Sequence, residues 1–135
     1  MREESSNSAG IKFLRIDYEK VFNYLKEYAE RIVKRGDAEL VILFGSLARG
    51  DYTATSDADV LVISSKAKDD RFIDRPLKFM DPKAPIPLEP KVLTIEEAVK
   101  MSRRKERFMK DVLQKGIILA GDTSLYRNLL KLSRD

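Results

Sequence analysis

The chain contains no histidine, no cysteine and no tryptophan among its 135 residues. Serine and cysteine hydrolase triads, zinc sites built on imidazole or thiolate, the usual haem ligands and disulfide frameworks all need the missing side chains. The longest uninterrupted apolar run, residues 40–44, is far shorter than the roughly 20 residues of a membrane-spanning helix. Any catalysis must therefore use oxygen ligands, hydroxyls, amides and cations, and any bound metal should be a hard divalent ion.

Charge is unevenly distributed along the chain, which carries 26 Lys and Arg against 22 Asp and Glu. Residues 37–65 hold one basic and five acidic side chains, whereas residues 66–135 hold 17 basic and 11 acidic ones. This profile suits a cation site within a protein that otherwise attracts anions. Because the sequence shows neither an apolar leader nor a membrane-spanning run, we expect a soluble, cytoplasmic protein.

Hydrophobic periodicity predicts a single mixed α/β (α+β) domain over residues 13–135, preceded by a flexible tail over residues 1–12 that is rich in Ser, Asn and Glu. Residues 66–85 contain several turn-forming pairs and give no clear pattern. The elements that we expect are a helix from Asp17 to Gly36, strands over 38–44 and about 57–64, an edge strand over 86–93 with prolines, a helix with a capping box at Thr94, a helix that stops at Gly116, a strand over 117–120 and a last helix.

A glycine and a serine, Gly45 and Ser46, follow the first predicted strand. A strand that turns here into a short helix presents free backbone N–H groups and a hydroxyl at one point, which is a way of binding phosphate. Gly45 would allow close approach of the backbone, and Arg49, one helical turn later, could reach the same region. Taken alone, a Gly-Ser pair at the end of a strand is more often part of an ordinary turn than of a phosphate site.

Two aspartates, Asp57 and Asp59, begin the second predicted strand. At positions i and i+2 their side chains leave the same face of a strand, with Cα atoms roughly 6.5–7 Å apart. Two such carboxylates can bind one ion or bridge two, and without a cation they repel each other. With Gly45 and Ser46 upstream at this spacing, we favour a metal site over the alternative, in which the two aspartates are simply solvent-exposed residues at the start of a strand.

The combined pattern resembles a known family. Gly45-Ser46, ten intervening residues and then Asp57-Ala58-Asp59 are similar to the signature of the nucleotidyltransferase superfamily of DNA polymerase beta. The fuller string Gly-Ser-x-x-Arg-Gly, followed by Ser-Asp-x-Asp-x-Leu-Val, resembles its small prokaryotic branch, the minimal nucleotidyltransferases. The likeness covers most of residues 17–126 and implies the nucleotidyltransferase fold, a small mixed β-sheet flanked by helices.

This resemblance implies an enzyme that transfers an NMP, AMP from ATP by preference, to a hydroxyl acceptor with the help of two Mg²⁺ ions, for which Mn²⁺ could substitute. The residues that match the family's nucleotide-binding positions are Gly45, Ser46, Arg49 and Ser56. Asp57 and Asp59 would hold both ions, which stabilise charge on the attacking and leaving oxygens.

In the family, a third carboxylate on the adjacent strand completes the metal site. Glu89 is the candidate that we favour, although it is flanked by Pro87 and Pro90, whereas the family more usually has an Asp in a smooth apolar strand. Asp81 and Asp74 are the alternatives. If none of the three reached the ions, the domain would be a catalytically degenerate module of the same fold that binds nucleotide or a partner.

The resemblance also implies a partner, since such domains are often paired with a small helical HEPN protein as toxin and antitoxin, the transferase adenylylating the toxin. Nucleic acid is an alternative acceptor. The basic run Arg103, Arg104, Lys105 and Arg107 could steer such a polyanion or an acidic protein, or form a solvated junction between helices. We favour the junction, because no aromatic residues interleave with the cations.

Overall fold

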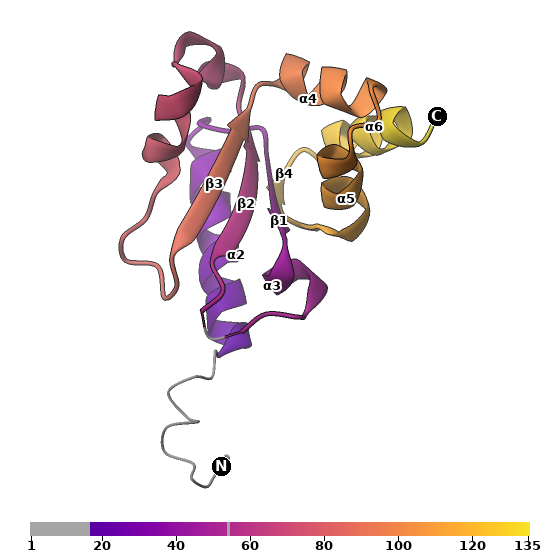
Figure 1. Ribbon diagram of the computed structural model, residues 1–135. Coiled ribbons are helices and arrows are strands. Elements are labelled where there is room, and N and C mark those ends of the chain that lie inside the picture. Colours follow the sequence, from indigo (N-terminus) through magenta and orange to yellow (C-terminus); the bar gives the residue numbers. More distant parts are fainter. Residues whose placement is uncertain (1–16, 54) are drawn as a thin grey trace, which may run out of the picture.

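The computed structural model describes residues 17–53 and 55–135, which fold around one four-stranded sheet (Figure 1). The predicted tail over residues 1–12 and the predicted start of the domain at residue 13 lie outside the described residues. In the described part, no helix is both long enough and apolar enough to span a bilayer. The elements are α2 (Tyr18–Lys34), β1 (Leu40–Phe44), α3 (Ser46–Arg49), β2 (Ala58–Ile63), the 3-10 segments η1 (Ser65–Asp69) and η2 (Phe72–Phe79), β3 (Leu88–Leu93), α4 (Ile95–Arg103), α5 (Arg107–Lys115), β4 (Ile117–Gly121) and α6 (Thr123–Arg134).

The sheet is mixed, with the strand order β3-β2-β1-β4. Strand β1 is antiparallel to both β2 and β4, whereas β2 and β3 are parallel. The predicted mixed α/β architecture is therefore confirmed. Strand β3 lies at the edge of the sheet, where Pro90 removes no interior ladder hydrogen bond, as its prolines predicted.

One face of the sheet packs against α2. Helix α2 begins after Asp17, whose side chain accepts a hydrogen bond from the Lys20 backbone N–H at 3.2 Å, and the chain turns at Gly36 with a φ of 81°. Alternate strand residues point to this face because side chains of a strand alternate. They form a buried apolar cluster that includes Val41, Leu43, Val60, Val62, Leu88 and Val92 together with Val21, Leu25, Tyr28, Ala29 and Ile32 of α2.

The opposite face is covered at only one end. There, Leu40, Ile42, Leu61 and Ile63 are buried beneath α4, α5 and α6. Figure 1 shows these three helices gathered at one end of the sheet and α3 at the other end of β1. Since β2 and β3 both run towards the covered end, their first residues lie at the open end.

The chain between β2 and β3, which gave no pattern in the sequence, forms η1 and η2. Phe79 is the anchor of η2: its ring is buried and its carbonyl accepts a hydrogen bond from the Tyr28 hydroxyl at 2.6 Å. Four large apolar side chains of this region are instead exposed, namely Phe72, Ile73, Leu77 and Met80. Of Leu77, Phe79 and Met80, only Phe79 therefore reaches the core.

Helix boundaries after β3 agree closely with the sequence patterns. Thr94 caps α4, accepting from the Glu97 N–H at 3.1 Å while the Glu97 side chain accepts from the Thr94 N–H at 2.8 Å. The basic run lies where α4 ends at Arg103 and α5 begins at Arg107. Its predicted position at a helix junction is thus confirmed.

Candidate active site

Strand β1 ends in a sharp turn at Gly45. This glycine has a φ of 77°, a region that side-chain-bearing residues rarely adopt. A Cβ at this position would also collide with Oδ2 of Asp59. The Asp59 carboxylate therefore lies directly against the Gly45 backbone, which brings the predicted phosphate turn and a predicted metal ligand together.

Helix α3 is a single turn of four residues that holds Ser46 and Arg49 beside this turn. The Ser46 hydroxyl donates to the Ser56 hydroxyl at 3.2 Å, and Ser56 Oγ accepts from the Thr53 N–H at 2.8 Å. The structure thus joins the two predicted nucleotide-binding serines. Arg49 is exposed, and its Nε lies 3.3 Å from Oδ2 of Asp51.

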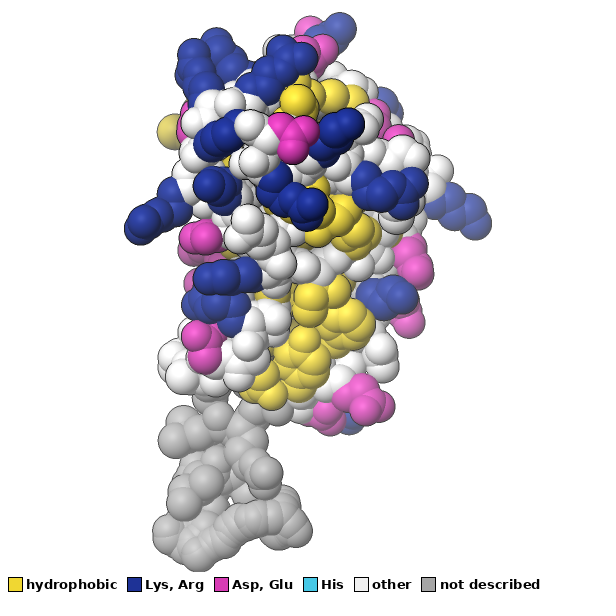
Figure 2. Space-filling view, turned by 90° about the vertical axis from the view of Figure 1, so that its right-hand side faces the viewer, with side chains coloured by type: hydrophobic (Ala, Val, Ile, Leu, Met, Phe, Trp, Pro, Cys, Tyr) yellow, Lys and Arg dark blue, Asp and Glu magenta, His cyan; other side chains and the backbone are white. Residues whose placement is uncertain are grey.

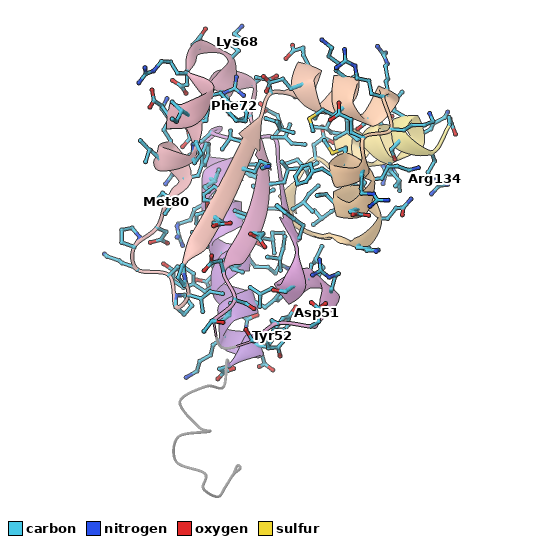
Figure 3. The ribbon with its side chains drawn as sticks, in the orientation of Figure 1. Asp51, Tyr52, Lys68, Phe72, Met80 and Arg134 are labelled. Carbon is cyan, nitrogen blue, oxygen red and sulfur yellow. The ribbon has the colours of Figure 1, made fainter. Side chains whose placement is uncertain are left out.

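The loop between α3 and β2 is fastened to α2 by aromatic stacking. The Tyr52 ring stacks on Tyr18 with centroids 5.2 Å apart, and Tyr18 stacks on Phe22 at 5.9 Å. Burial, followed by the neighbouring Tyr52, raises the pKa of the Tyr18 hydroxyl. This stack fixes one end of the segment that carries Ser56 and Asp57 into β2. Figure 3 shows Asp51 and Tyr52 between α3 and the start of α2.

Two carboxylates face each other across neighbouring strands. Asp59 of β2 is paired in register with Glu89 of β3, so their side chains share the open end of the sheet face. Burial raises the pKa of Asp59 to about 6, with the negative charge of Glu89 as the next cause and Asp57 as a smaller one, while Arg49 opposes the shift. Asp57 lies one residue before β2 rather than inside the strand, which corrects its predicted placement.

The two alternative third carboxylates are engaged elsewhere. Asp81 accepts a hydrogen bond from the Tyr24 hydroxyl at 2.5 Å and lies 3.8 Å from Arg31 of α2. Asp74 forms a 2.8 Å ion pair with Arg71. Of the three candidates, only Glu89 is adjacent to Asp59.

The carboxylate set has the right chemistry for a hard divalent ion, since oxygen donors suit Mg²⁺ and Mn²⁺. Within residues 17–53 and 55–135, however, no group of three acidic side chains is already gathered closely enough to enclose an ion. Glu89 is exposed and Asp57 and Asp59 are half-buried. The donor types fit a divalent ion.

A hollow of about 340 Å³ lies beside the Gly45 turn. It is lined by Phe44, Gly45, Arg49, Phe108, Asp111, Val112, Lys115 and Gly116. The Phe108 ring meets Phe44 edge to face at 5.3 Å, and Nζ of Lys91 lies 4.7 Å from the Phe108 centroid. Phe108 is half-buried and packs against the core cluster while it lines the hollow, and the sequence patterns did not single out Lys91. The sequence did hold one signal for Lys91: it follows Glu89 by two residues on the same predicted strand, which places the two side chains on the same face.

Comparison with protein families assigns most of the chain to one of them. The model of the nucleotidyltransferase domain matches residues 24–119. The matched segment includes Gly45, Ser46, Asp57, Asp59 and Glu89.

Individual proteins similar to this chain carry related names. A relative from Methanocaldococcus jannaschii, named "Putative protein adenylyltransferase MJ0604", is 46% identical over 41 residues, which are 29% of this chain and 41% of that protein. A solved structure described as a "putative nucleotidyltransferase from Sulfolobus solfataricus" superposes with a TM-score of 0.50 at 23% identity, covering 84% of this chain and 88% of that one. A structure described as "toxin-antitoxin with AMP-PNP" has a TM-score of 0.48 at 14% identity, covering 81% and 83%.

Proposed function

We propose that this chain, which belongs to the nucleotidyltransferase domain family, transfers an NMP, AMP from ATP, to a hydroxyl group of another protein. The acceptor oxygen bonds to the α-phosphorus, the bond to the β-phosphate breaks and pyrophosphate leaves. The observation that carries the proposal is the meeting of Gly45, Asp59 and Glu89 at the open end of one sheet face. The partial match to a relative named as a protein adenylyltransferase supports AMP as the group transferred and a protein as the acceptor.

In this proposal, one set of residues binds the nucleotide and another binds the metal ions. The Gly45 turn and the Ser46 and Ser56 hydroxyls would bind phosphate oxygens, with Arg49 adding positive charge. The adjoining hollow of about 340 Å³ falls within the roughly 300–1,000 Å³ of small-molecule sites. Its aromatic wall would exclude water from the nucleotide.

Asp57, Asp59 and Glu89 would hold two Mg²⁺ ions, or Mn²⁺ in their place. When bound, such ions supply charge neutralisation on the phosphates and lower the pKa of the attacking hydroxyl. Asp59 supports this assignment, because its position against Gly45 places a carboxylate beside the phosphate turn. Glu89 reaches the same point from the neighbouring strand.

The partner that we propose is a small helical HEPN-type protein, with this chain as the antitoxin of the pair. The support is the resemblance of the Gly45–Ser46 and Asp57–Asp59 strings to the minimal nucleotidyltransferases. The protein encoded beside this one is therefore the first acceptor to test.

The test uses ATP labelled on its α-phosphate, Mg²⁺ and the neighbouring protein. Wild type should label that protein, whereas Asp59→Asn and Asp57→Asn should lower the rate by at least about 100-fold, as expected when charge stabilisation at the reacting phosphate is removed. Asp69→Asn is the matched control, since Asp69 is an exposed carboxylate of η1. Equal labelling by wild type and Asp59→Asn would overturn the mechanism.

The alternative function is that of a catalytically degenerate domain that binds nucleotide without transferring it. One observation favours it: in the described residues, the three carboxylates are not already gathered around one point. It predicts that Mg²⁺-ATP raises the melting temperature of wild type without any transfer of label. Transfer by wild type that is lost in Glu89→Gln would exclude it.

A further inference from the structure

A second hollow, of about 370 Å³, lies between η2, β3, α4 and α5. We call it the α4 groove. Its floor is apolar and is formed by Phe72, Leu93, Met101 and Phe108, and its other lining residues are Lys91, Glu97, Lys100 and Arg104. Phe72 is 62% exposed. It is the first residue of η2, whereas Met80 follows the other end of η2 (Figure 3).

The unneutralised charge around the α4 groove is positive. Lys91, Lys100 and Arg104 are exposed, and none of them forms an ion pair with a side chain in the described residues. The one acidic lining residue, Glu97, is already held by Nη1 of Arg75 at 2.7 Å and by the Thr94 N–H. Figure 2, which views the molecule from the side of α5 and α6, shows many Lys and Arg side chains around apolar surface.

The α4 groove and the hollow beside the candidate active site share one wall residue. Phe108 lines both this groove and the hollow beside Gly45. Lys91, whose Nζ lies over Phe108, shares a strand and a sheet face with Glu89 two residues away. A chain lying in the groove could therefore place its next residues at the carboxylates.

We propose that the α4 groove binds an acidic, amphipathic segment of the protein that accepts the nucleotide. Apolar side chains of that segment would pack on Phe72, Met101 and Phe108, and its carboxylates would meet Lys91, Lys100 and Arg104. A protein segment is favoured over nucleic acid, because Met101 adds a flexible aliphatic surface to the rings of Phe72 and Phe108 and because the proposed function takes a protein as acceptor. The acceptor role rests on the proposed transferase function, whereas binding itself does not.

A random copolymer of Glu and Tyr provides a defined probe, since it is acidic, amphipathic and rich in hydroxyls. Its dissociation constant is measured by fluorescence anisotropy at roughly physiological salt. Phe72→Ser and the double variant Lys100→Ala/Arg104→Ala should each weaken binding by at least about tenfold. The matched controls Ile73→Ser, at the more exposed neighbouring position (77%), and Lys26→Ala/Lys34→Ala on α2 should bind as wild type does.

The outcomes separate this inference from the proposed function. If wild type labels the tyrosines of the copolymer, and Asp59→Asn binds the copolymer normally but does not label it, the groove inference and the proposed function are both supported. If wild type binds the copolymer normally but does not label it, only the acceptor role is contradicted. Equal weakening by groove and control variants would show general charge attraction and overturn the inference. Tighter binding of oligothymidylate, or a dimer in sedimentation that Phe72→Ser dissociates, would assign the groove to nucleic acid or to a second copy and would also overturn it.

Discussion

The two ends of one sheet face differ in what covers them. At the covered end, Leu61 of β2 is fully buried under the α4–α6 helices. Two residues earlier on the same strand and the same face, Asp59 lies half-buried against Gly45 with Glu89 beside it. One strand thus supplies a core residue at one end and a charged, ligand-accessible residue at the other.

This difference separates the part of the sheet that stabilises the fold from the candidate site. The covered end removes apolar area from water and stabilises the fold. At the open end, the negative charges of Glu89 and Asp57 act on Asp59, and this repulsion opposes folding. Conflict of this kind is expected at functional sites, because a group held for chemistry is not held for stability.

The largest loss of stability is expected when a buried side chain at the covered end is truncated. Leu61→Ala removes a buried side chain from close packing and should lower the free energy of unfolding by about 3 kcal/mol. Leu77→Ala is the control, because Leu77 is 71% exposed, and it should change stability by less than about 0.5 kcal/mol. Urea unfolding followed by circular dichroism measures both. Equal losses would contradict the assignment of the core to this end.

A smaller effect is expected at the junction of β1 with the open end. Gly45→Ala puts a side chain at a positive φ and brings its Cβ into collision with Asp59 Oδ2. It should therefore lower the free energy of unfolding by about 2–3 kcal/mol and weaken nucleotide binding. Gly50→Ala, where φ is 87° but nothing lies within 4 Å of the added Cβ, isolates the strain and should cost about 1 kcal/mol. The difference between the two variants measures the contact with the carboxylate. No difference would mean that Asp59 moves away freely.

The smallest effect concerns pH. Because the pKa of Asp59 is raised to about 6 in the folded chain from about 3.9 when unfolded, the unfolded chain binds fewer protons between these values. The free energy of unfolding contributed by this group therefore falls as pH rises through this window. Asp59→Asn should be more stable than wild type by about 1 kcal/mol at pH 7.5, a value reduced by solvent screening at a half-exposed site.

The matching measurement is thermal unfolding of wild type and Asp59→Asn from pH 4 to pH 7.5. Their difference should be smallest near pH 4, where the carboxyl is protonated in the folded chain and about half protonated in the unfolded chain, and should grow towards pH 7.5. Mg²⁺ should raise the melting temperature of wild type more than that of the variant. A stability difference that stays constant with pH would show that Asp59 is not under electrostatic strain.

Much of the fold could be predicted from local patterns. Capping by Asp17 and Thr94, the stop at Gly116 and the placement of the proline-containing strand at a sheet edge all depend on residues close in sequence. Residues 66–85 could not be predicted, because η2 is held by distant contacts such as Phe79 with Tyr28 and Arg75 with Glu97. The position of Phe108 in the walls of two hollows could not be predicted either, because helical periodicity does not reveal which end of a sheet a helix covers.

The sequence by itself limited the chemistry that a site in this chain can use and supplied the first residues of the candidate site. Without histidine or cysteine, any metal has to be bound by oxygen ligands, and the Gly45-Ser46 and Asp57-Asp59 strings lie close enough along the chain to be recognised together. Only the tertiary structure decided that Glu89, rather than Asp81 or Asp74, adjoins Asp59. The register of two strands separated by a long connection depends on packing of whole faces, which no local pattern encodes.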